Sequence, residues 1–168
     1  MSKRDLFINY ATTEVYHGNM TEYKYPNGTI PGYTREPSKA ELNAYFKAAD
    51  ATAYSPTVHW CGVFQVFLLK KAGVSCHWDR AILNDLYEED LEITSGAAAQ
   101  TGLQVGDIVR VQQNQHHLMV VDPVSKGFIR GIEGNAGGLK YPMLAINYMG
   151  NARSNVVEQI QFRYRIVN

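Results

Sequence analysis

Cys61 is the residue of this chain best placed to act as a nucleophile. It directly follows Trp60 and opens the apolar run 62–69. If that run is a helix, the sulfur lies at the positive end of the helix dipole, near free backbone N–H groups. Such a place favours the thiolate and lowers the cysteine pKa. A buried structural cysteine is the alternative, because cysteine is among the most buried residue types.

A thiolate nucleophile needs a base, and the chain offers five histidines: His17, His59, His77, His116 and His117. Only His116 and His117 open an expected strand. Successive strand residues point to opposite faces, so one of the pair faces the helix layer and the other faces away. A histidine at the head of a strand, beside a helix that begins with cysteine, suits a Cys–His pair. An ordinary half-exposed histidine is the alternative.

Glu133 and Asn135 could supply the third group, which holds an imidazole in its productive tautomer. They form a polar pair at the end of the apolar segment 128–132, and either could reach a neighbouring histidine. A simple turn is the alternative, because glycines surround them.

Cys76 and His77 are adjacent, but sequence neighbours rarely face each other as a catalytic pair does. A zinc site built with them would lack the short paired-ligand spacing of structural zinc sites. We expect Cys76 to pack, and a disulfide between Cys61 and Cys76 would abolish the nucleophile. The glycines of 134–138 form no phosphate loop, since no lysine followed by serine or threonine comes after them. No metal or organic cofactor is expected.

Two helices can be placed with local signals. Ser38 precedes Glu41 by three positions, the capping-box spacing, which predicts a helix over 38–51. The segment 62–71 is apolar nearly all round and ends in basic residues before a glycine, which predicts a buried central helix. A shorter third helix is expected over 79–88.

The second half of the chain turns to short β-branched segments separated by polar or glycine-containing turns. This pattern predicts strands that pair antiparallel in sequence order. Helices first and strands second make an α+β domain. The expected strands are 107–111, 118–121, 128–131 and 156–167.

The breaker-rich segment 16–37 predicts a long ordered loop or short turns. Seven of the eleven tyrosines lie in the first 54 residues. They either line a groove or fasten the loop to the core with their rings.

The composition bounds the class of protein. A chain of 168 residues with 45% hydrophobic and 19% charged residues is expected to fold as a single domain, with 1–53 as an extension integrated with a core over 54–168. Sixteen basic and sixteen acidic residues cancel, which argues against a nucleic-acid or anionic-lipid partner. No stretch predicts a membrane span, and the charged start lacks the apolar block of a signal peptide. We therefore expect synthesis in the cytoplasm.

Five ordered motifs resemble those of the CHAP and NlpC/P60 papain-like cysteine peptidases. In those families a tryptophan-cysteine pair opens the central helix, a glycine-aspartate turn begins the first strand, and a histidine starts the second. A Glu-x-Asn element on the third strand completes the site. The matching segments here are Trp60 to Phe64, Leu69 to Val74, Val105 to Val109, His117 to Val121 and Ile132 to Asn135.

The resemblance implies a papain-like fold and a cysteine amidase or endopeptidase that cleaves peptidoglycan peptides. Cys61 then attacks an amide carbonyl, His117 takes and returns the proton, and Glu133 or Asn135 orients the imidazole. The apolar run after His117 favours it over its neighbour as the base. The expected substrate contacts are Tyr54, Trp60 and His116.

Relatives without secretion signals are often phage lysins or antibacterial toxins delivered by a bacterial secretion machine. The chain is thus expected to act after export, in the periplasm or cell wall of a target cell, with an immunity or inhibitor protein as a possible partner. Two alternatives stay open. One is a papain-like protease, deamidase or transglutaminase-like toxin that acts on a protein. The other is an inactive papain-like module that binds a partner.

Overall fold

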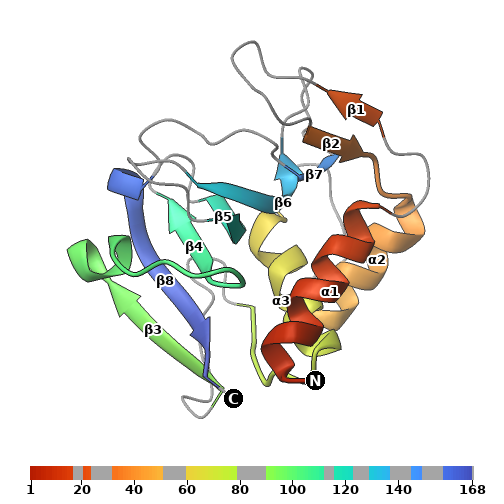
Figure 1. The fold of residues 1–168 in the computed structure, drawn as a ribbon. Coiled ribbons are helices and arrows are strands. Elements are labelled where there is room, and N and C mark those ends of the chain that lie inside the picture. The colour runs from red at the N-terminus through yellow and green to blue at the C-terminus, as the bar shows by residue number, and fades with distance from the viewer. Residues whose placement is uncertain are drawn as a thin grey trace.

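Three α-helices pack on an antiparallel sheet in the computed structural model of the protein (Figure 1). The structure describes residues 1–16, 21–23, 32–50, 60–78, 90–111, 116–122, 129–136, 145–148 and 157–167. The helices group together, and the last of them lies against the centre of the sheet. The class is α+β, as the sequence predicts.

Both N-terminal helices begin with a capping box. In α1 (Lys3–Val15), the hydroxyl of Ser2 accepts from the backbone N–H of Asp5, and the Asp5 carboxylate accepts from the N–H of Ser2. This helix was not expected from the sequence. In α2 (Lys39–Ala48), Ser38 and Glu41 make the same reciprocal pair, which confirms the predicted helix start.

The central helix is α3 (Cys61–Lys71), and it is buried along almost its whole length as predicted. It begins one residue earlier than the apolar run indicated, so that Cys61 is its first residue. It ends before Gly73, whose φ of 81° suits a glycine after a helix. The helix packs on β5 and β6, the strands that carry the predicted base and its partner.

The described strands form one sheet in the order β1-β2-β7-β6-β5-β4-β8-β3, and all neighbours are antiparallel. Their bounds are β1 (Thr21–Tyr23), β2 (Gly32–Arg35), β3 (Leu91–Ser95), β4 (Ile108–Val111), β5 (His116–Asp122), β6 (Arg130–Ala136), β7 (Ala145–Tyr148) and β8 (Ile160–Ile166). A 3-10 helix, η1 (Gly96–Gln100), follows β3, and another, η3 (Val157–Gln159), precedes β8.

Pairing in sequence order holds from β4 to β7 and fails at the C-terminus. The last strand returns across the sheet and lies between β4 and β3 (Figure 1). The prediction failed there because the edge on which a strand pairs depends on a distant partner and not on its own residues. The loop expected over 16–37 contains β1 and β2. The helix expected over 79–88 lies outside the described residues.

The core divides between the two faces of the central strands. Met119 belongs to the cluster that includes the three helices, whereas Leu118 and Val120 belong to a second cluster with Val109 and Ile129. This alternation is the strand pleat, and it decides which side chains of β5 face α3. None of the helices within the described segments is long and apolar enough to cross a membrane.

Arg35 joins the N-terminal elements. Its buried guanidinium forms ion pairs with Glu14 of α1 at 3.1 Å and with Glu41 of α2 at 2.9 Å. It also donates to the hydroxyl of Tyr45 at 3.4 Å. A cation between two carboxylates thus fixes β2 against both helices, which in turn flank α3.

Candidate active site

The site is built where the start of α3 meets the start of β5. The Sγ of Cys61 lies 3.6 Å from Nδ1 of His117. Next to it, Nε2 of His116 lies 2.6 Å from Oε2 of Glu133, which is on β6. The structure therefore brings together four of the residues that the sequence singled out. All four are at least nine-tenths buried.

The charges of the site favour a thiolate. Burial alone would raise the pKa of the Cys61 thiol, but attraction and hydrogen bonding from His116, followed by those from His117, hold it well below its usual range. Burial would lower the pKa of His116, but attraction from Cys61 and then from Glu133 raises it to about 10. These shifts favour a thiolate and an imidazolium, with a carboxylate behind the imidazolium.

Glu133 contacts His116, whereas the sequence analysis expected Glu133 or Asn135 to orient His117. Met119 of β5 is opposite Ile132 of β6, so Glu133 comes opposite Leu118, on the His116 side of the pleat. The strand alternation predicted that only one of the two histidines would face the helix layer. In the structure both of them interact with Cys61. His116, the first residue of β5, attracts the Cys61 sulfur as well.

The second nitrogen of His117 has a different environment. Its Nε2 is buried and has no hydrogen-bond partner in the part of the chain that the structure describes. The ring of Trp78 lies T-shaped to that of His117, with centroids 5.9 Å apart and planes at 75°. Trp78 also covers Gly62, where an added Cβ would overlap the indole. The sequence analysis missed Trp78, because nothing in its local pattern links it to the cysteine.

Trp60 was expected to contact substrate, and the structure places it in the core instead. It is 1% exposed, and its ring lies 6.1 Å from Tyr45 and 6.2 Å from Phe64, centroid to centroid. The indole packs against Phe64 in the first turn of α3. Tyr54 lies outside the described residues. Asn135 is in β6, but its side chain is outside the description.

Gly134 allows β6 to approach the helix. A Cβ at this position would lie 2.6 Å from the Trp60 ring and 2.8 Å from Cβ of Phe64. The close approach holds β6, which carries Glu133, against the first turn of α3. Gly134, for which a turn was the alternative interpretation, is thus a packing glycine within a strand.

Asp107, from the glycine-aspartate motif, has a structural position. It is fully buried, and it binds the guanidinium of Arg165 at 2.6 and 2.8 Å and the backbone N–H of Gln104 at 2.8 Å. Gly106, with φ of 87°, makes the turn that precedes β4. These contacts fix the beginning of the strand next to β5.

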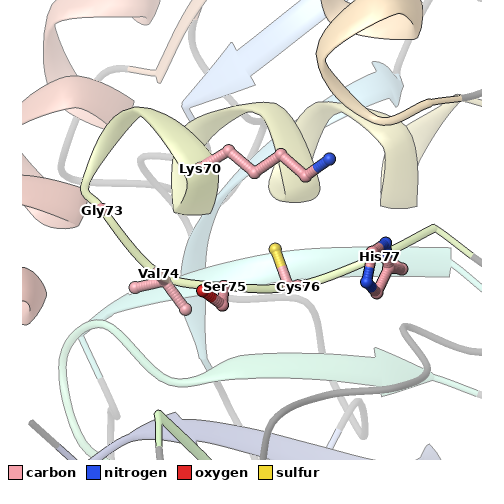
Figure 2. Close-up of a pocket in the computed structure, with 6 residues that line it drawn as sticks. All are labelled: Lys70, Gly73, Val74, Ser75, Cys76 and His77. Atoms are coloured by element: carbon pink, nitrogen blue, oxygen red, sulfur yellow. The ribbon is translucent and has the colours of Figure 1, made fainter.

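Cys76 packs, as expected. It is a free thiol that is 2% exposed, its Sγ lies 3.9 Å from the carbonyl oxygen of Val66, and burial raises its pKa to about 12. It lines an open pocket of about 440 Å³ at the C-terminal end of α3 (Figure 2), together with Lys70, Gly73, Val74, Ser75 and His77. Lys70 of this pocket lies roughly 13 Å along the helix axis from Cys61, so the pocket and the nucleophile are at opposite ends of α3.

Among the described residues, no group of three or more histidine, cysteine, aspartate and glutamate side chains is arranged to hold a metal ion. Comparisons with protein-family models, with curated proteins and with solved structures found no match to this chain.

Proposed function

We propose that this protein is a papain-like cysteine hydrolase that cleaves amide or peptide bonds by acyl transfer, with the peptide of bacterial peptidoglycan as its substrate. One observation carries the proposal. The sulfur at the start of a buried helix lies 3.6 Å from the imidazole of His117, and the imidazolium of His116, which attracts the sulfur, is held by a buried carboxylate. Such a constellation supplies a nucleophile, a proton carrier and an orienting group.

The chemistry follows from these parts. The Cys61 thiolate attacks the carbonyl carbon of the scissile amide, and free backbone N–H groups in the first turn of α3 stabilise the oxyanion. An imidazolium of the histidine pair protonates the leaving amine. Water then hydrolyses the thioester, and the neutral imidazole accepts the proton of that water.

The choice of substrate depends on the five ordered sequence motifs, which resemble those of peptidoglycan amidases and endopeptidases. The same resemblance is the basis for proposing that the protein is a lysin or an antibacterial effector, which reaches the wall of a target cell after delivery. The positions of Cys61 and Glu133 at the expected places in a helix and a strand support the resemblance.

The test is digestion of purified peptidoglycan by the wild type and by Cys61→Ala, with mass spectrometry of the released fragments. We expect fragments with the wild type only, and their masses identify the bond that is cleaved. Equal fragments from folded Cys61→Ala would contradict the proposed nucleophile. If wild type with a reactive Cys61 released no fragments, the substrate proposal would be wrong, and a protein substrate would be favoured.

A further inference from the structure

Two imidazoles interact with the Cys61 sulfur, and their second nitrogens differ. Nε2 of His116 bonds to the Glu133 carboxylate at 2.6 Å, whereas Nε2 of His117 is buried and meets no partner within the described segments. We propose, building on the hydrolase function above, that the two histidines have separate tasks. His116 carries the proton of the reaction, and His117 is a neutral hydrogen-bond donor to the sulfur.

The assignment of His116 follows from its carboxylate. Glu133 is 1% exposed, and a buried carboxylate is strongly stabilised by a cation in contact with it. The bond at Nε2 fixes the ring and leaves Nδ1 for the sulfur. An imidazole held in this way can lose its proton and recover it without losing its orientation.

The assignment of His117 follows from its Nε2, which has no hydrogen-bond partner among the described residues. A proton on Nε2 would leave a buried N–H without an acceptor in the part of the chain that the structure describes, which costs about 1–3 kcal/mol. The single proton of a neutral ring therefore belongs on Nδ1, which lies 3.6 Å from the sulfur. Trp78 lies beside the ring in a T-shaped arrangement. His117 can thus donate one hydrogen bond to the thiolate, while its Nε2 meets no acceptor among the described residues.

His116 alone carries the proton through every step of the reaction. The thiolate forms the C–S bond as the carbonyl π electrons move to oxygen. When these electrons return, the C–N bond breaks, and the amine takes the proton from Nδ1 of His116. Neutral His116 then removes a proton from water, whose oxygen attacks the thioester carbon. Uptake of that proton restores the imidazolium, and collapse of the tetrahedral intermediate then expels the thiolate, while His117 keeps its proton throughout.

The test compares the same substitution at two adjacent positions, His116→Asn and His117→Asn. Asparagine places a donor N–H near the position of Nδ1, but it does not exchange a proton at neutral pH. The substrate is p-nitrophenyl acetate, whose leaving group needs no acid, so that deacylation reports the base. Steady-state hydrolysis and the acetyl-enzyme, seen by intact-protein mass spectrometry, are measured together.

We expect His116→Asn to lose roughly 10²–10⁴-fold in turnover and to accumulate acetyl-enzyme. His117→Asn is expected to stay within about 10-fold of the wild type without accumulation, since it loses no proton carrier. Glu133→Gln should also accumulate acetyl-enzyme, and it replaces His116→Asn as the test variant if His116→Asn does not fold. The reverse ranking, or equal losses in both asparagine variants, would overturn the separation of tasks. A wild type that forms no acetyl-enzyme, or a Cys61→Ala variant that still forms it, would instead refute the hydrolase function.

Discussion

Gly134→Ala tests whether the close approach of β6 to α3 positions the catalytic groups. The added Cβ would lie 2.6 Å from the Trp60 ring and 2.8 Å from Cβ of Phe64. Ordinary carbon contacts begin near 3.5 Å, so strand and helix must separate by roughly 0.7–0.9 Å. Overpacking of this kind costs about 1–3 kcal/mol of unfolding free energy. A displacement near 1 Å at a catalytic centre can cost about 10²-fold in rate.

Gly96→Ala is the matched control. Gly96 has φ of 62° and no atom within 4 Å of an added Cβ, so alanine there costs about 1–2 kcal/mol through backbone strain alone. Both variants are measured by chemical denaturation and by p-nitrophenyl acetate hydrolysis per folded molecule. We expect similar losses of stability, but a large loss of activity only in Gly134→Ala. Equal activity in the two variants would refute the argument that this approach positions Cys61 against its histidines.

Three further predictions concern the surroundings of the site. Arg35→Met removes the buried cation between the half-buried carboxylates of Glu14 and Glu41, and it should lower the unfolding free energy by about 1–3 kcal/mol in chemical denaturation. A loss below about 0.5 kcal/mol would show that the charge network is dispensable. Gly62→Ala should slow turnover because its Cβ overlaps Trp78, and adding Trp78→Ala should restore part of the rate; no recovery in the double variant would contradict the steric cause. The hydrogen bond from Lys3 and other contacts lower the pKa of Asp90, so its stabilisation is fully present above the unfolded value of about 3.9 and is lost as the pH falls through the lower folded value. Asp90→Asn should therefore flatten the acid limb of a stability-against-pH curve, and an unchanged limb would argue against this linkage.

The helices that carried local signals were predictable. Ser38 and Glu41 specify a helix start by their own hydrogen bonds, and the apolar circumference of 62–71 specifies burial whatever its neighbours are. The helix α1 has the same kind of capping pair, Ser2 and Asp5, but its apolar stripe is sparse, with Phe7, Ala11 and Val15 as its buried residues. A single residue per turn gives too weak a pattern to separate a short helix from a loop.

The residue set of the site was predictable, but not its pairing. Sequence order places Glu133 near a histidine, whereas the register of β5 with β6 decides which one. A shift of one residue would move Glu133 to the other face and give it to His117. The position of Trp78 against Gly62 and His117 is a tertiary contact between segments, and no local pattern specifies it.

The ionisation of Cys61 at neutral and mildly acidic pH tests the central claim most directly, because it needs no knowledge of the substrate. The measurement is the ultraviolet absorbance of the thiolate, taken as the difference between the wild type and Cys61→Ser while the pH is lowered. Cys76 is common to both proteins and cancels. An ordinary thiol with a pKa of about 8.5 would be only roughly 0.3% ionised at pH 6. We predict that most of the difference signal persists at pH 6, held by the histidine pair. A signal that appears only above about pH 8 would contradict a nucleophile at this site.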